Sequence, residues 1–167
     1  MSGTRLSLSL AAEAQTRALA DRLAAVLGAG DTLLLDGPIG AGKTAFARAL
    51  IQAAQARAGL PPEDVPSPTF TLVQTYDAGP FEIWHADLYR LGHPHEVLEL
   101  GLDEAFDLAL CLIEWPDRLG DLAPTDALRL TFGPGPSDTA RTLDLVSADP
   151  SWADRLSFLA AKDDPDA

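Results

Sequence analysis

Residues 37 to 44 read Gly-Pro-Ile-Gly-Ala-Gly-Lys-Thr, which matches the pattern G-x-x-x-x-G-K-[ST] at every position. In this pattern the glycines let the backbone curl, so that successive N–H groups point at phosphate oxygens. Lys43 supplies a compact positive charge to the β- and γ-phosphates, and the Thr44 hydroxyl can bind Mg²⁺. The set of residues predicted to bind a nucleotide here is Gly37, Pro38, Ile39, Gly40, Ala41, Gly42, Lys43, Thr44 and Ala45.

The context of this motif supports phosphate binding. An apolar run over residues 32–36 precedes it, and a helical pattern over residues 41–58 follows it. The alternative is a glycine turn that only caps a helix. The complete match, the strand and helix on either side and the scarcity of lysine elsewhere all weigh against that alternative.

Two acidic residues follow apolar runs and could supply the chemistry that a phosphate loop lacks. Hydrolysis needs a carboxylate near Mg²⁺ and a group that positions water. Glu114 closes the apolar run 108–113, as in a Walker B segment, and Asp87 closes the run 81–86. Ligands of open α/β sheets lie beyond the carboxyl ends of the strands, so a parallel strand would place Glu114 beside the loop. The direction of the second strand is open, and either acid could simply be solvated at a strand end.

A third candidate segment reads Ser67-Pro68-Thr69-Phe70-Thr71. It lies where other P-loop proteins carry a switch that senses the γ-phosphate. The pattern alone favours a simpler interpretation, in which Pro66 and Pro68 make a rigid, extended lead into a strand.

Several other residue types have two possible roles. Trp115 could cover a nucleotide or pack against a partner, although core packing is the commoner role of tryptophan. His85 could orient a neighbour or be a structural, hydrogen-bonded histidine. His93 and His95 have no second set of ligands, so they predict no zinc site. Cys111 lies in an apolar run and is predicted to be an inert, buried thiol.

The hydrophobic pattern predicts an α/β fold of the three-layer P-loop type. The expected sheet is mixed and mostly parallel, with one antiparallel hairpin around residues 77–80 and helices on both faces. Strands are predicted over residues 5–10, 32–36, 69–75, 81–86, 108–113, 127–132 and 139–146. Helices are predicted over residues 12–27, 41–58, 95–100, 102–106 and 151–161. We expect one domain over residues 1–162 and a short acidic tail over residues 163–167.

Composition restricts the partners and the compartment. The net charge is −13, and the chain holds two lysines and ten scattered arginines. Direct binding of a nucleic-acid backbone normally needs clustered lysine and arginine, so any RNA is expected to be reached through a partner protein. The acidity could equally serve only solubility. The absence of a secretory signal, of a long apolar run and of a second cysteine predicts a cytoplasmic protein without a membrane span.

These segments together resemble one family, the TsaE (YjeE) family, which comprises the P-loop ATPases of bacterial tRNA threonylcarbamoyladenosine (t6A) synthesis. The phosphate loop is generic, whereas three further segments are specific in combination, and the resemblance runs from about residue 5 to about residue 160. The matching segments are Gly-Pro-Ile-Gly-Ala-Gly-Lys-Thr (37–44), Ser-Pro-Thr-Phe-Thr-Leu-Val (67–73), His-Ala-Asp-Leu-Tyr-Arg-Leu (85–91), Glu-Leu-Gly-Leu (99–102) and Ile-Glu-Trp-Pro (113–116).

The resemblance implies an Mg²⁺-dependent ATPase that is weak alone and stimulated by its partners. Those partners would be the threonylcarbamoyl transferase TsaD and its companion TsaB, which modify adenosine-37 of tRNAs that read codons beginning with A. The ATPase would support turnover of the transferase without performing the transfer, and it would reach tRNA only through these partners.

The resemblance also implies roles for individual residues. Thr44 and Glu114 would hold Mg²⁺. Asp87 would serve hydrolysis, either by positioning water or through the metal, and Lys43 would act with it on the phosphates. The remaining assignments are a switch-like loop with Ser67 and Thr69, and nucleotide contacts from Glu13 and Arg141.

Two other functions remain as alternatives. A small-molecule kinase on the same fold would need several arginines around the phosphates, and only Arg90 and Arg118 are close in sequence to the proposed site segments. A GTP-dependent switch would carry an Asn-Lys-x-Asp segment, yet the one lysine outside the phosphate loop is Lys162, within Ala-Lys-Asp-Asp.

Overall fold

The computed structural model describes residues 3–38, 40–137 and 140–161. Ile39, one of the predicted nucleotide-binding residues, and the predicted tail 163–167 lie outside the described residues.

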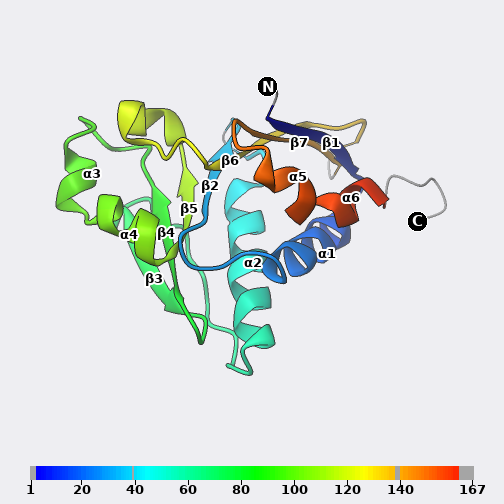
Figure 1. Ribbon diagram of the computed structural model, residues 1–167, viewed down its shortest axis with the longest axis horizontal. Coiled ribbons are helices and arrows are strands. Elements are labelled where there is room, and N and C mark those ends of the chain that lie inside the picture. Colours follow the sequence, from blue (N-terminus) through cyan, green and yellow to red (C-terminus); the bar gives the residue numbers. More distant parts are fainter. Residues whose placement is uncertain (1–2, 39, 138–139, 162–167) are drawn as a thin grey trace.

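The described strands form one seven-stranded mixed sheet in the order β1-β7-β6-β2-β5-β4-β3 (Figure 1). The pairs β6–β2, β2–β5 and β5–β4 are parallel, and β1–β7, β7–β6 and β4–β3 are antiparallel. The strands are β1 (Thr4–Leu10), β2 (Thr32–Asp36), β3 (Val73–Asp77), β4 (Glu82–Asp87), β5 (Leu110–Glu114), β6 (Leu128–Pro134) and β7 (Arg141–Ser147).

The predicted mixed α/β sheet is therefore confirmed, and so is the antiparallel pairing around residues 77–80. Parallel pairing is limited to the four central strands. The chain also reverses between β6 and β7, and β1 pairs with β7 antiparallel, so the sheet carries antiparallel strands at both edges.

Helices cover both faces of the sheet, as predicted (Figure 1). One face packs against α1, α2, α5 and α6, and the other packs against α3, α4 and the 3₁₀-helix η1. The helices are α1 (Glu13–Ala24), α2 (Lys43–Arg57), α3 (Glu96–Glu99), α4 (Leu102–Leu108), η1 (Pro116–Leu122), α5 (Ser151–Arg155) and α6 (Ser157–Ala161). Among the described helices, none combines the length and the apolar character that crossing a bilayer requires.

The central strands are apolar along their whole length because both of their faces are covered. Successive side chains of a strand point to opposite faces. In β2, Leu33 and Leu35 accordingly lie in the core under α1 and α2, and Leu34 lies in the core under α4. The same alternation divides Leu112 and Ile113 of β5 between the two cores.

Most element ends differ from the sequence predictions by one to three residues, and two elements differ in a way that changes the local structure. The predicted strand over residues 69–75 begins only at Val73, because residues 68–72 form a turn closed by the Leu72 N–H and the Pro68 carbonyl at 2.7 Å. Leu72 takes a left-handed φ of 69°, which ends the turn before the strand starts. The predicted last helix is divided into α5 and α6 at Leu156, whose φ of −100° and ψ of 10° depart from helical values.

Candidate functional site

Three parallel strands end side by side, and this edge of the sheet carries the site. The phosphate loop follows β2, while β4 and β5 end in Asp87 and Glu114. In the strand register Glu114 lies opposite Leu35 on one side and opposite Asp87 on the other. The sequence alone does not predict the direction of β4. In the structure β4 pairs with β5 in parallel, and this pairing brings the carboxylates of Asp87 and Glu114 together.

Within the described residues, Gly37, Gly40 and Gly42 of the phosphate loop all take positive φ values. Gly37 has a φ of 137°, and a Cβ at this position would lie 2.7 Å from the carbonyl oxygen of Phe132. Gly42 has a φ of 107° and caps α2, which begins at Lys43. The first backbone N–H groups of a helix have no acceptor within the helix, so the start of α2 favours anions.

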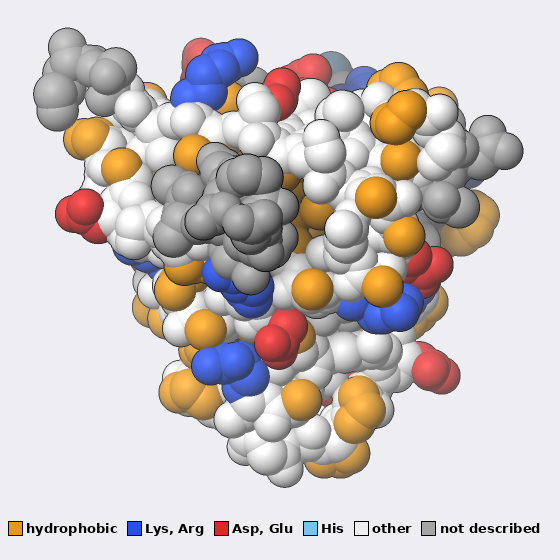
Figure 2. Space-filling view, turned by 90° about the vertical axis from the view of Figure 1, so that its right-hand side faces the viewer, with side chains coloured by type: hydrophobic (Ala, Val, Ile, Leu, Met, Phe, Trp, Pro, Cys, Tyr) orange, Lys and Arg blue, Asp and Glu red, His pale blue; other side chains and the backbone are white. Residues whose placement is uncertain are grey.

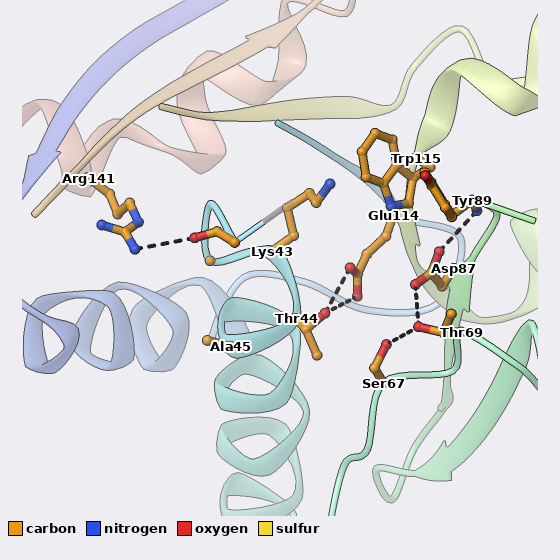
Figure 3. Close-up of a pocket in the computed structure, with 12 residues that line it drawn as sticks. Lys43, Thr44, Ala45, Ser67, Thr69, Asp87, Tyr89, Glu114, Trp115 and Arg141 are labelled. Carbon is orange, nitrogen blue, oxygen red and sulfur yellow. Dashed lines mark hydrogen bonds between the residues drawn. The ribbon is translucent and has the colours of Figure 1, made fainter. Parts of the chain in front are cut away.

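The loop and the two strand ends enclose a cavity of about 560 Å³, within the range of small-ligand pockets (Figure 3). Its walls come from the phosphate loop, the segment with Ser67 and Thr69, the ends of β4 and β5, and β7. The lining residues are Gly40, Gly42, Lys43, Thr44, Ala45, Ser67, Thr69, Asp87, Tyr89, Glu114, Trp115 and Arg141.

The Thr44 hydroxyl and the Glu114 carboxylate are in direct contact in this cavity. Thr44 Oγ1 lies 2.9 Å from Glu114 Oε1 and 3.0 Å from Oε2. These are hard oxygen donors, which suit Mg²⁺, and Mg²⁺ sites commonly use one or two protein ligands together with phosphates and water. Within the described residues no cluster of three or more His, Cys, Asp or Glu side chains forms a complete metal cage.

A chain of hydrogen bonds joins Asp87 to the segment that was weighed as a switch. Thr69 Oγ1 donates to Asp87 Oδ2 at 3.2 Å, and the Ser67 hydroxyl lies 2.8 Å from the Thr69 hydroxyl. The other carboxylate oxygen of Asp87 accepts the Tyr89 N–H at 3.0 Å. The segment therefore lies directly against a carboxylate of the cavity, which the rigid-lead interpretation did not predict.

Lys43 is only 4% exposed, although it lines the cavity. Its ammonium group donates to the Gly37 carbonyl at 2.5 Å and lies 3.5 Å from the centroid of the Trp115 ring. Burial lowers the pKa of Lys43 below its ordinary value, and the negative charges of Glu114, Asp36 and Asp87 oppose this shift.

Arg141 and Glu13 meet at a second, smaller hollow that adjoins the cavity. Arg141 Nε donates to the Ala41 carbonyl at 3.0 Å, and its Nη2 donates to the Gly40 carbonyl at 3.3 Å. The hollow has a volume of about 180 Å³ and shares Gly42, Ala45 and Arg141 with the main cavity. Its other lining residues are Glu13, Thr16, Ala41 and Phe132.

Some site residues were not assigned by the sequence. Tyr89 lines the cavity and packs on Trp115, with ring centroids 4.9 Å apart. Asp36 accepts a hydrogen bond from Arg129 at 2.9 Å across β2 and β6. The sequence could have indicated Tyr89 through its place in the segment 85–91. The Asp36–Arg129 pair depends on the pairing of β2 with β6, and no pattern of neighbouring residues in the sequence predicts it.

The structure also shows the surroundings of two arginines and a cysteine that the sequence analysis considered. Neither Arg90 nor Arg118 lines the cavity, and Arg90 instead stacks on Phe70 at 4.8 Å. Cys111 is buried, and burial raises the pKa of its thiol to about 12, as expected of an inert thiol.

A family model described as "Threonylcarbamoyl adenosine biosynthesis protein TsaE" matches residues 10–142. The chain belongs to the TsaE family. The tRNA threonylcarbamoyladenosine biosynthesis protein TsaE of Rickettsia bellii is 40% identical over 123 residues, which cover 74% of this chain and 83% of that protein. The TsaE of Rickettsia conorii is 45% identical over 114 residues, which cover 68% of this chain and 63% of that protein.

The fold of a solved structure agrees with this assignment to TsaE. A crystal structure of Bacillus subtilis YdiB matches the present fold with a TM-score of 0.77 at 26% identity, covering 96% of this chain and 97% of that chain. The TsaE match spans the phosphate loop, both strand-end carboxylates, Glu13 and Arg141. The family resemblance of the sequence is thus confirmed.

Proposed function

We propose that this protein binds ATP with Mg²⁺ and hydrolyses it, as the ATPase component of the t6A modification machinery. The carrying observation is the convergence of four side chains on one cavity. Lys43 and Thr44 come from the phosphate loop, and Asp87 and Glu114 come from adjacent parallel strands. A phosphate loop alone binds phosphate, and the two carboxylates supply what hydrolysis adds.

Thr44 and Glu114 are the residues that would hold Mg²⁺. Their oxygens already lie within 3.0 Å of each other at the mouth of the loop. When bound, Mg²⁺ neutralises charge on the phosphate oxygens. The role of these side chains is to fix the position of that charge relative to the backbone N–H groups at the start of α2.

Lys43 and Asp87 would act on the phosphates and on water. The Lys43 ammonium would leave the Trp115 ring and contact the β- and γ-phosphates. The negative charge of the phosphates attracts the ammonium more strongly than the face of an aromatic ring does. The Asp87 carboxylate orients a water molecule toward the terminal phosphate, since its Oδ atoms are held by Thr69 and by the Tyr89 N–H. Ser67 and Thr69 would then form a switch, because their hydrogen bonds to Asp87 would change when the terminal phosphate is present.

The nucleoside end of ATP would lie toward the second hollow. This hollow continues from the main cavity and is lined by Glu13 and Arg141. Arg141 is anchored on the Gly40 and Ala41 carbonyls, so its guanidinium is held beside the phosphate loop. Its position supports a nucleotide contact from Arg141, and Glu13 lines the same hollow.

The partners in this proposal are the transferase TsaD and its companion TsaB, and tRNA is reached only through them. The names of the Rickettsia relatives place those proteins in tRNA threonylcarbamoyladenosine biosynthesis. The net charge of −13 disfavours direct contact with RNA. On the face drawn in Figure 2, basic side chains stand apart among acidic and apolar ones and form no continuous patch. A cytoplasmic location follows from this role.

Phosphate release from ATP, with and without the transferase complex, tests the proposal. We expect slow Mg²⁺-dependent release by the protein alone, faster release with the complex, and loss of both in Lys43→Ala. Nucleosides and sugars are added in parallel to detect phosphoryl transfer, and GTP replaces ATP in a further set. Efficient transfer to such an acceptor, or a tenfold preference for GTP, would contradict the proposal in favour of a kinase or a GTP switch.

A further inference from the structure

His85 lies on β4, two residues before Asp87, and contacts the other strand-end carboxylate. Its imidazole is fully buried, and Nε2 lies 2.6 Å from Glu114 Oε2. In the register of β4 with β5, Glu114 lies opposite Asp87 and is therefore the diagonal neighbour of His85. Residues two apart on a strand share a face, so β4 directs Asp87 and His85 to the same side of the sheet.

The two ring nitrogens of His85 have different surroundings. The Glu114 carboxylate is a hydrogen-bond acceptor, and the His85 tautomer that carries a proton on Nε2 donates to it. Within the described residues Nδ1 is buried without a hydrogen-bond partner. All of the hydrogen bonding of His85 within the described residues is thus directed at Glu114.

Thr44 alone cannot fix the orientation of the Glu114 carboxylate. Its hydroxyl has one hydrogen, and it lies at nearly equal distances, 2.9 and 3.0 Å, from the two carboxylate oxygens. The His85 contact distinguishes these oxygens because it holds Oε2 from the side of β4. The carboxylate is thereby prevented from rotating, and its plane stays turned toward Thr44 and the phosphate loop.

We propose that His85 is a positioning residue, which sets the affinity of the site for its divalent cation by orienting Glu114. This inference rests on the proposed function, in which Thr44 and Glu114 hold Mg²⁺. Side chains that hydrogen-bond a metal ligand from behind typically change metal affinity or activity by about 10- to 100-fold when they are removed. A purely structural histidine would instead affect folding and leave the Mg²⁺ dependence of nucleotide binding unchanged.

The test compares His85→Leu, which removes the donor, with His85→Gln, whose amide N–H can reach the position of Nε2. Thr32→Val is the matched control, because Thr32 is also buried in a central strand and its hydroxyl has no partner among the described residues. A non-hydrolysable ATP analogue is titrated in EDTA, Mg²⁺ is then titrated at a fixed analogue concentration, and thermal unfolding is followed for each protein.

We expect His85→Leu to need about 10- to 100-fold more Mg²⁺ at the midpoint, with affinity in EDTA changed less than about threefold. His85→Gln should recover most of the loss, and Thr32→Val should behave as the natural protein. A Mg²⁺ midpoint of folded His85→Leu within twofold of the natural protein would overturn the inference.

A second pair of variants keeps the test valid if His85→Leu does not fold. His85→Asn retains an amide, but its shorter side chain cannot reach Glu114 as His85→Gln can. Normal Mg²⁺ dependence in His85→Gln with a weakened one in His85→Asn supports the positioning role, and equal behaviour of the two contradicts it. Absence of saturable binding of Mg²⁺ and the analogue by the natural protein, alone and with its partners, would instead defeat the proposed function itself.

Discussion

The ammonium group of Lys43 lies 3.5 Å from the centroid of the Trp115 ring, so the two residues that flank the cavity hold each other. Trp115 reaches this position through a left-handed backbone conformation, with a φ of 59°. Such a conformation is uncommon for a bulky residue and is found at functional sites more often than elsewhere. Since phosphate attracts an ammonium more strongly than an aromatic face does, nucleotide binding should separate the pair.

Tryptophan fluorescence can report this separation. We expect an Mg²⁺-bound ATP analogue to change the emission of the natural protein, because the cation leaves the Trp115 ring. Trp115→Phe should abolish the nucleotide-dependent change. Trp152→Phe is the control, since Trp152 is buried on α5 and its indole N–H donates to the Asp126 carbonyl. A signal that persists in Trp115→Phe would show that the pair does not report binding.

Glu114→Gln should separate metal-dependent turnover from nucleotide binding. The substitution keeps the shape of the side chain and removes the charge that faces Thr44. We expect Mg²⁺-dependent ATP hydrolysis to fall about 100-fold, equivalent to about 2.7 kcal/mol in activation free energy, with binding in EDTA retained. Phosphate release and analogue titration measure the two quantities. Glu104→Gln, the same change at an exposed position of α4, should have neither effect, and equal turnover by the two variants would exclude Glu114 from the chemistry.

Asp87 and Thr69 should act together on turnover. Asp87→Asn replaces the carboxylate that accepts a hydrogen bond from the Thr69 hydroxyl at 3.2 Å with a neutral amide. A group that positions water and accepts its proton contributes about 100-fold or more, so turnover in the partner complex should fall by that factor with the fold intact. Thr69→Val should lower turnover by a smaller factor, and Thr69→Ser should restore it. Thr75→Val, an exposed threonine of β3, serves as the control. Normal hydrolysis by Asp87→Asn in the complex would show that its catalytic role is wrong.

Local sequence signals were sufficient for part of this site. The phosphate loop depends on backbone conformations that only its glycines adopt easily, so its pattern alone predicts its shape. Glu114 could be placed because a short, continuous apolar run predicts a buried parallel strand that ends at the ligand edge. Both signals lie within a few neighbouring residues of the chain.

Contacts between distant segments could not be predicted in this way. The direction of β4 depends on its pairing with β5, and that pairing brings Asp87 beside Glu114 and His85 beneath it. The turn at residues 68–72 depends on a single left-handed residue, Leu72, which has no glycine to mark it. The contact of Thr69 with Asp87 follows from that turn and was not visible in the sequence.

The conformation of residues 60–66, which lead to Thr69, should depend on the buried side-chain amide of Gln55. Gln55 of α2 is 1% exposed, donates to Glu63 Oε2 at 2.7 Å and accepts the Glu63 N–H at 3.1 Å. Gln55→Leu would remove these hydrogen bonds, and because water can reach the exposed Glu63, each loss costs about 0.5–1.5 kcal/mol in the free energy of unfolding. Urea denaturation measures the loss, and limited proteolysis tests whether the chain is cleaved faster within residues 60–66. Arg57→Leu, an exposed position on the same helix, should leave both unchanged.

Cys111 gives a prediction for alkaline pH. Burial raises the pKa of its thiol from the ordinary value of 9.0 to about 12, so the folded state keeps the proton that the unfolded state loses between these values. The stabilisation is complete below pH 9 and is lost as pH rises toward 12, because the unfolded state then binds fewer protons. The free energy of unfolding should fall by up to about 1.4 kcal/mol per pH unit from this group. Comparison of the natural protein with Cys111→Ala by urea denaturation between pH 8 and pH 11 isolates it, since only the natural protein carries the thiol. Equal pH slopes for the two proteins, or rapid reaction of the folded thiol with a disulfide reagent at pH 8, would show that Cys111 is accessible to water.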